Sequence, residues 1–429
     1  MRTFTLLLLA VAGLTVTSRA SAESCADLDD EAGPDVIKKL YIENGDTQEF
    51  MIRALGRQLV RSADPAGKLR IIYRNRPTCD IRKDMFGTAA PGPVKMITVA
   101  GRKVQYLKVA QSDDPSVATA VGECTVPDLD TDAAAVTIQL GIGATYLSSC
   151  ADAVATNPNL GTFDGPIQAY GFITHPSSTQ NAISAEEGLL AYGFPEAGGD
   201  AQPWTVQDLR FKRSNTASTT LTMAAAVRLT PTKFAIGARQ TPLAPESSDE
   251  LKKQVHNSAN PEATLGILGL DLYDIDRSFV KLLPFRSWDQ RFAYYPDKTK
   301  DSFDKQNVRD GHYVPWAPTP YMAIKNGAGT DIADVDAKRF YDLVRGFRKD
   351  TDVDGLRTIA QNSLIPECAM TVTRKGDGAD LEVYEDPAPC GCYYEANVKG
   401  GATACAKCTG EGTSCGTNGK CRLGFCEAR

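Results

Sequence analysis

Three turns that each join an expected strand to an expected helix carry the residue types that bind small anions. The first turn, Gly-Asp-Thr-Gln at 45–48, follows an apolar run and opens an amphipathic run. Asp46, with Glu49 three residues later, matches a capping box, which requires no ligand. The turn also lies where a strand end and a helix N-terminus would meet, and ligands of α/β sheets bind there. A helix cap and a ligand loop are compatible interpretations.

The second turn follows Arg213, where six of the next seven residues are Ser, Thr or Asn. Hydroxyls, backbone N–H groups at a helix start and a guanidinium together suit a tetrahedral oxyanion. An over-supplied helix cap is the alternative. The third turn, within 140–149, has Gly141, Gly143, Ala144 and Thr145 after a strand. It lacks the third glycine and the acidic residue of a dinucleotide motif, so we expect a tight turn or one wall of a ligand site.

Two other chemistries are considered. His312 beside Asp310 could act as a general base, but no G-x-S-x-G nucleophile motif accompanies them. We therefore expect no enzyme and no catalytic residue, and we place the aromatics of 294–318 at a hinge. The spacings C-x-C and C-x-x-C in the tail could bind zinc in a reducing compartment. Export favours disulfides instead, so neither a metal nor a cofactor is expected.

Strand-like and helix-like runs alternate from residue 36 to about 365, which predicts an α/β fold with mostly parallel sheets. A Gly/Pro-rich break at 157–166 separates two sets of elements. The expected strands are 40–43, 69–74, 136–142, 168–175, 208–213, 264–270 and 292–296, and the expected helices are 48–60, 185–194, 218–229, 249–257 and 337–349.

The N-terminus resembles a signal peptide, with Arg2, an apolar run and a small-residue site at 20–22. A lipoprotein is the alternative, but Glu23 precedes Cys25 where a lipobox needs small residues. We expect an exported protein, periplasmic or at the cell surface. Its formal charge of −6 becomes −8 when Arg2 and Arg19 are removed with the signal peptide, so no basic field would attract nucleic acid.

The twelve cysteines divide into two groups, and in an exported chain they predict disulfides. Four are scattered through the first 150 residues, and eight are crowded into a Gly-rich tail with few aliphatic side chains. Such a tail needs crosslinks in order to fold. The cysteines expected in disulfides are Cys25, Cys79, Cys124, Cys150, Cys368, Cys390, Cys392, Cys405, Cys408, Cys415, Cys421 and Cys426.

Four segments in this order resemble the phosphate-binding solute receptors of ABC transporters. They are "IENGDTQEFMIRAL", "PWTVQDLRFKRSNTASTT", "PEATLGILGLDLYD" and "DGHYVPW". The resemblance covers about 36–365, and it departs from the family at 215–217, where a Gly would precede the Thr pair. The tail is similar to small Cys-rich, EGF-like modules of surface proteins.

The resemblance implies a type II periplasmic-binding-protein fold, in which one α/β lobe is inserted in another and the lobes close on a small oxyanion, most of all phosphate. It implies a monomer that can serve an ABC permease. The alternative is a surface or adhesive protein that keeps the fold without a ligand. The divisions expected are a signal peptide at 1–22, lobe 1 at 23–166, lobe 2 at 167–290, a return to lobe 1 at 291–365 and the tail at 366–429. The ligand residues implied are Asp46, Thr47, Gln48, Ala144, Thr145, Arg213, Ser214, Ser218, Thr219 and Thr220.

Overall fold

The computed structural model describes residues 24, 25, 28, 37–87, 103–108, 121–126, 137–151, 157–194, 201–234, 247–416 and 419–428. The expected signal peptide lies outside these residues. Within them, no helix has both the length and the apolar character required to cross a membrane.

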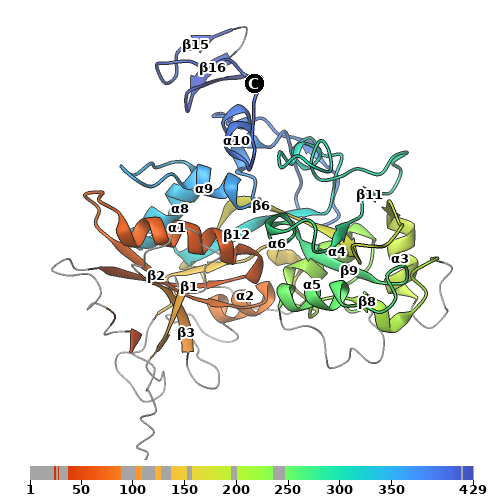
Figure 1. Ribbon diagram of the computed structural model, residues 1–429. Helices are drawn as coiled ribbons and strands as arrows, with labels where there is room; N and C mark the ends of the chain where they lie inside the picture. Colours follow the sequence, from red (N-terminus) through yellow and green to blue (C-terminus); the bar gives the residue numbers. More distant parts are fainter. Residues whose placement is uncertain are drawn as a thin grey trace, which may run out of the picture.

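The first lobe is an α/β unit built on the strands at the N-terminal end of the chain (Figure 1). Strand β1 pairs in parallel with β2 and β5, and β3 and β4 add antiparallel strands at the edge. Helix α1 buries Met51, Ile52, Leu55 and Leu59 against this sheet, at the spacing of one helical face. The elements are β1 (Lys38–Asn44), η3 (Asp46–Gln48), α1 (Glu49–Arg61), β2 (Leu69–Asn75), α2 (Thr78–Phe86), β3 (Lys103–Leu107), β4 (Val121–Thr125), β5 (Leu140–Ile142), η5 (Leu147–Ser149), α8 (Val335–Arg345) and α9 (Gly355–Gln361).

Two long antiparallel strands connect this lobe to the second one. Strand β6 (Leu160–Thr174) pairs with β12 (Trp316–Ile324) along its first part and with β9 along its last part. The strand order in the described residues is β4-β3-β2-β1-β5-β12-β6-β9-β8, with β10 also on β6. Here β8 is Arg210–Phe211, β9 is Leu265–Gly269 and β10 is Lys281–Leu282. The chain therefore leaves lobe 1 along β6 and returns along β12, and the expectation of one lobe inserted in the other is confirmed.

The second lobe packs its helices around β9, which pairs in parallel with β8. Its core gathers aromatic side chains, including Phe172, Tyr192, Trp204 and Phe234. The elements are β7 (Ile183–Ser184), α3 (Ala185–Gly193), η6 (Gln207–Leu209), β8 (Arg210–Phe211), α4 (Ser218–Ala226), α5 (Ser248–His256), β9 (Leu265–Gly269), α6 (Leu270–Ile275), β10 (Lys281–Leu282), β11 (Phe285–Arg286) and α7 (Gln306–Arg309).

Two expectations about local structure are wrong. The Gly/Pro-rich stretch 157–166 is not a break, because β6 already begins at Leu160 and continues through it. The register with β12 shifts between Pro318 and Pro320, and this irregularity accommodates prolines in a paired strand. The strand expected at 292–296 is reduced to an isolated bridge between Tyr294 and Phe285.

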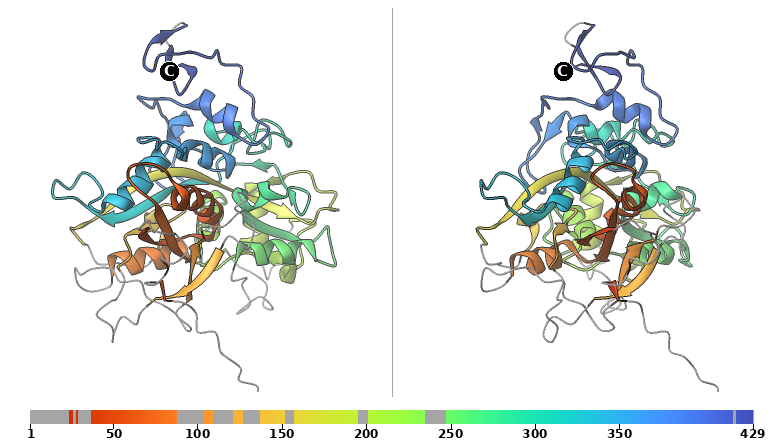
Figure 2. Two further views of the ribbon diagram at one scale, coloured as in Figure 1. Left: turned by 60° about the vertical axis from the view of Figure 1, so that its left-hand side comes forward. Right: turned by 90° about the vertical axis from the view of Figure 1, so that its left-hand side faces the viewer.

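The tail stacks on the two lobes and ends in a small three-stranded sheet (Figures 1 and 2). All twelve cysteines are paired, as Cys25–Cys124, Cys79–Cys150, Cys368–Cys390, Cys392–Cys405, Cys408–Cys421 and Cys415–Cys426. The tail elements are η8 (Glu367–Ala369), β13 (Val372–Thr373), β14 (Glu382–Val383), α10 (Gly391–Asn397), β15 (Ser414–Cys415), β16 (Gly419–Arg422) and β17 (Phe425–Ala428).

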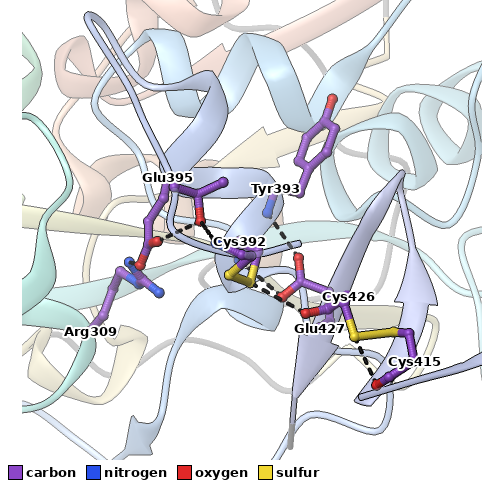
Figure 3. Close-up of a disulfide and its surroundings, with 9 residues drawn as sticks. Arg309, Cys392, Tyr393, Glu395, Cys415, Cys426 and Glu427 are labelled. Atoms are coloured by element: carbon purple, nitrogen blue, oxygen red, sulfur yellow. Dashed lines mark hydrogen bonds and ion pairs between the residues drawn. A yellow bond between two sulfur atoms is a disulfide. The ribbon is translucent and has the colours of Figure 1, made fainter. Parts of the chain in front are cut away.

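The buried carboxylate of Glu427 joins the terminal sheet of the tail to helix α10 (Figure 3). Glu427 on β17 accepts hydrogen bonds from the backbone N–H groups of Cys392 and Tyr393, at 2.9 and 2.8 Å, in the first turn of α10. Glu395 on α10 in turn pairs with Arg309 of α7 at 2.9 Å. Polar contacts thus connect the terminal sheet to α10 and α10 to α7.

Candidate functional site

A cavity of about 140 Å³ lies between the two lobes. Lobe 1 contributes the end of β2 and the start of α1, and lobe 2 contributes the end of β8 and the starts of α5 and α6. Its lining residues are Asp46, Glu49, Phe50, Asn75, Arg76, Pro77, Arg213, Ser247, Ser248, Asp249, Asp271 and Leu272.

A carboxylate of lobe 1 is bound by lobe 2 in this cavity. Asp46 Oδ2 forms an ion pair with Arg213 Nη1 and accepts a hydrogen bond of 3.0 Å from the backbone N–H of Ser248. Arg213 Nη1 also donates to Ser248 Oγ at 3.2 Å. Ser248 begins α5, so the carboxylate faces a helix N-terminus as well as a guanidinium. Lobe 2 therefore presents a cation, a backbone donor and a hydroxyl to an anion.

The expected capping box of Asp46 and Glu49 is wrong. Gly45 is the N-cap of η3, and neither η3 nor α1 has a side-chain cap. Glu49 instead pairs with Arg53 and accepts a hydrogen bond from Tyr73 Oη at 3.1 Å. Asp46 turns away from its own helix because the guanidinium and the α5 terminus offer stronger, charge-assisted partners.

A second carboxyl group, that of Asp271, lies almost fully buried beside the first. Burial raises the pKa of Asp271 well above its usual range, and the nearby charge of Asp46 raises it further. Asp271 Oδ1 accepts a hydrogen bond from Gln168 Nε2 at 3.1 Å, and Gln168 Oε1 accepts one from Gln48 Nε2 at 3.1 Å. This chain of amides connects the cavity to the strand β6 that joins the lobes.

A buried charge network stands behind the lobe 1 wall. Arg76, which lines the cavity, pairs with Asp84 at 2.9 Å, and Asp84 lies 3.5 Å from Arg74. Arg74 pairs with Glu43, which is fully buried on β1. Burial raises the pKa of Glu43 to about 8, opposed by the charge of Arg74 and supported by that of Asp84. These ion pairs hold Arg76, which follows β2, in position beside the cavity.

Of the ten residues expected to hold the ligand, Asp46 and Arg213 line the cavity. Five others are buried and do not line the cavity: Thr47, Gln48, Ser218, Thr219 and Thr220. Thr220 Oγ1 donates to the carbonyl of Arg213 at 3.0 Å, so it positions the strand end that carries the guanidinium. Ser214 is bonded to Thr216 at 3.2 Å, within its own loop.

The third turn lies farther from the cavity than its sequence suggests. The backbone N–H of Ala144 donates to Thr78 Oγ1 at 3.0 Å, and its carbonyl accepts from Tyr170 Oη. Thr145 Oγ1 bonds Thr222 of lobe 2 at 2.8 Å and Asp377 of the tail at 2.7 Å. A Cβ at Gly143 would lie 2.9 Å from Pro320 Cγ, so the close approach at this glycine is made by β12. These groups bridge the lobes without lining the cavity.

Several residues that line the cavity are not predicted by any local pattern in the sequence. Asp271 falls within the "LGLDLYD" segment that carries the family resemblance, but its carboxyl group was not singled out. Ser247 is the N-cap of α5, and its side chain accepts a hydrogen bond from the backbone N–H of Glu250. This pattern predicts the start of a helix and does not predict a ligand. Asn75 ends β2 and Arg76 follows it directly, at the carboxyl edge of the parallel strands.

Other candidate chemistries find no support near this cavity. His312 Nδ1 and Asp310 Oδ1 are 2.7 Å apart, with the His312 side chain half exposed and neither residue lining the cavity. The described residues contain no group of three or more His, Cys, Asp or Glu side chains suited to a metal. A larger cavity of about 660 Å³ lies within the tail, away from the interlobe charges.

Comparison with known proteins gives similarity in shape only. No protein-family model matches the chain, and no curated protein matches it in sequence. A substrate-binding protein with bound phosphate from Clostridium perfringens aligns with 77% of this chain and 99% of its own, at 11% identity and a TM-score of 0.43. An ABC-type phosphate transport receptor from Vibrio cholerae aligns over 76% and 99%, at 13% identity and 0.40. PstS from Borrelia burgdorferi aligns over 77% and 98%, at 9% identity and 0.36.

Proposed function

We propose that this protein is an exported solute-binding protein that captures a small oxyanion, phosphate in particular, between its two lobes. The observation that supports this most is the Asp46 carboxylate, which Arg213 and the Ser248 N–H already hold at the α5 N-terminus. A site that binds a carboxylate in this way has the donors that a phosphate oxygen requires. Arg76 adds a second guanidinium to the same cavity.

The carboxylate of Asp46 provides the selectivity between phosphate and sulfate. An ionised carboxylate can only accept hydrogen bonds, so Asp46 favours an oxyanion that still carries a proton and disfavours sulfate. Asp271 adds a second carboxyl group from lobe 2, and its raised pKa favours the protonated form, which can donate a hydrogen bond to the ligand. Phosphate near neutral pH carries such a proton, whereas sulfate does not. The selectivity between phosphate and sulfate therefore follows from the pairing of donors on lobe 2 with the carboxylate acceptor on lobe 1.

Delivery to an ABC permease by a monomer would complete this function. The two-lobed architecture suits a carrier, because closure encloses a ligand and opening releases it. Export would depend on the segment 1–22, whose sequence resembles a signal peptide. Neither the permease nor export is needed for the anion site itself, so binding can be tested alone.

Calorimetry with phosphate and sulfate tests the proposal on the mature chain. We expect phosphate to bind more tightly than sulfate, and Arg213→Ala to weaken phosphate binding about 10- to 100-fold, the loss of one or two charge-assisted hydrogen bonds. Arg286→Ala is the matched control, because Arg286 pairs with Glu186 on the outside of lobe 2 at 3.1 Å. Equal affinity for the two anions, or binding of neither, would refute the proposal.

One observation favours the second candidate, a surface protein that keeps the fold without a ligand. Asp46 completes the Arg213 site from within the chain, so the closed arrangement needs no external anion. In that case the calorimeter would record no heat with either anion, while Asp46→Ala would still lower the free energy of unfolding. The same titration therefore separates the two functions.

A further inference from the structure

A loop of the C-terminal tail enters the interface between the two lobes. It connects β13 to β14 at 374–381, within the segment that the Cys368–Cys390 disulfide closes. Gly378 at its tip has a φ of +72°, and a Cβ there would lie 3.5 Å from the Ala225 carbonyl of α4. The tail therefore touches lobe 2 at the helix that follows the Arg213 loop.

Asp377 of this loop binds lobe 1 directly and is linked to lobe 2 through a threonine of lobe 1. Its Oδ2 accepts hydrogen bonds from Thr145 Oγ1 at 2.7 Å and from Ser149 Oγ, both in lobe 1. The Thr222 hydroxyl of α4 lies 2.8 Å from Thr145 Oγ1. Because Thr145 gives its proton to Asp377, Thr222 donates to Thr145 and joins the carboxyl group through it. Two hydroxyls of lobe 1 thus bind this side chain of the tail directly, and one hydroxyl of lobe 2 is linked to it through Thr145.

Arg374 fixes the base of the loop to the strand that joins the lobes. Its Nη1 donates to the Val314 carbonyl at 3.0 Å, and its Nη2 donates to the carbonyl of Trp316. The guanidinium lies 4.2 Å from the Trp316 ring centroid, and Tyr146 Oη donates to the Arg374 carbonyl at 2.8 Å. Since Arg374 is itself buried, the loop is anchored three residues before Asp377.

We propose that Asp377 is an interlobe clasp, through which the tail holds the two lobes in their closed arrangement. Opening would separate the Thr222 hydroxyl from Thr145, so it would lose a hydrogen bond to a hydroxyl that is polarised by its own bond to Asp377. The disulfide and the Arg374 anchor keep the carboxyl group close to its partners, which raises its effective concentration. The clasp requires no ligand and is independent of the anion that the cavity binds.

Hydrogen–deuterium exchange on the full, oxidised chain tests this clasp without any added anion. We expect Asp377→Ala to increase amide exchange about tenfold in η5 and in α4, because local opening loses about one charge-assisted hydrogen bond. The amides of β1 and β2, far from the loop, should keep their protection. Asp380→Ala is the matched control, since Asp380 has the same charge, lies three residues away and is exposed.

Thr222→Val provides a second route if the Asp377 variant does not fold. It removes the lobe 2 hydroxyl and leaves Asp377 with Thr145 and Ser149, so we expect about a fivefold increase in exchange, confined to α4 and η5. Exchange rates in Asp377→Ala that match those of Asp380→Ala would overturn the proposal. If only Thr222→Val can be purified, wild-type exchange in that variant would overturn it equally.

Discussion

The ion pair between Asp46 and Arg213 should couple the two lobes energetically, and a double-mutant cycle measures this. The variants are Asp46→Ala, Arg213→Ala and the double substitution. The two residues are 167 positions apart in sequence and belong to different lobes. Any interaction energy between them is therefore a contribution to lobe association and not to a local turn.

The structure sets the expected magnitude of the coupling. The Arg213 side chain is 6% exposed and that of Asp46 is 20% exposed, so the pair is much less solvated than a surface ion pair. Hydrogen bonds to charged groups contribute about 1.5–3 kcal/mol, whereas exposed pairs contribute about 0.2–1 kcal/mol. Asp46→Ala also removes the acceptor of the Ser248 N–H, and Arg213→Ala also removes the donor to Ser248 Oγ. Each single change should therefore lower the free energy of unfolding by about 3 kcal/mol. We expect a coupling energy of about 2 kcal/mol.

Urea unfolding followed by tryptophan fluorescence suits this cycle. All three tryptophans, Trp204, Trp288 and Trp316, lie in lobe 2 or on the strand that returns from it. A second cycle on Asp249 and Lys253 is the control, because this pair on α5 is 55% and 60% exposed. Its coupling should be about 0.3–0.5 kcal/mol.

Two outcomes would refute the reasoning. A coupling of less than about 0.5 kcal/mol between Asp46 and Arg213 would place the pair among ordinary surface contacts. A coupling equal to that of the control pair on α5 would lead to the same conclusion. Either result would remove the argument that lobe 2 is built to hold an anion at this point.

Two further predictions concern the stability of lobe 1. Because the pKa of Glu43 is raised from 4.5 to about 8, the unfolded chain releases this proton at lower pH than the folded chain. The free energy of unfolding should therefore fall as the pH rises through that window. Urea titrations from pH 5 to pH 8 should show that Glu43→Gln reduces this fall by a few kcal/mol. An unchanged dependence of the unfolding free energy on pH in the variant would contradict this. Replacing Cys79 and Cys150 with serine opens a loop with a sequence separation of 71 and should cost about 4 kcal/mol of unfolding free energy. The same change at Cys415 and Cys426 should leave the main fluorescence transition in place, and equal losses from both pairs would contradict a local effect.

The sequence predicted the regular elements well where their periodicity was strong. The apolar spacing of 48–60 gave α1, and the helices expected at 185–194, 218–229, 249–257 and 337–349 are all present within a few residues. The prediction of a break at 157–166 is wrong, because glycine and proline favour turns only as a local preference. Their place in β6 depends on the irregular register with β12, which lies more than 150 residues later.

Only the Asp46 and Arg213 part of the candidate site could be predicted from the sequence. Asp46 and Arg213 each stand in a turn that joins a strand to a helix, and such turns gather at one edge of a sheet. Ser248 and Asp271 enter the same cavity through the packing of α5 and α6, which no local pattern specifies. The position of Asp377 could not be predicted, because the cysteine density of the tail indicates disulfides and carries no information about where a loop of the tail packs.

The Asp46–Arg213 pair also sets a condition on any ligand of the cavity. An external oxyanion that binds Arg213 must share the guanidinium with Asp46 or displace it, so the free energy of the internal pair is subtracted from the intrinsic affinity. A coupling of about 2 kcal/mol would reduce the apparent affinity about 30-fold. The unfolding cycle thus fixes the largest penalty that the calorimetric affinity can contain. A phosphate ligand is compatible with the closed structure only if its contacts with Arg213, Arg76 and the Ser248 N–H together exceed that penalty.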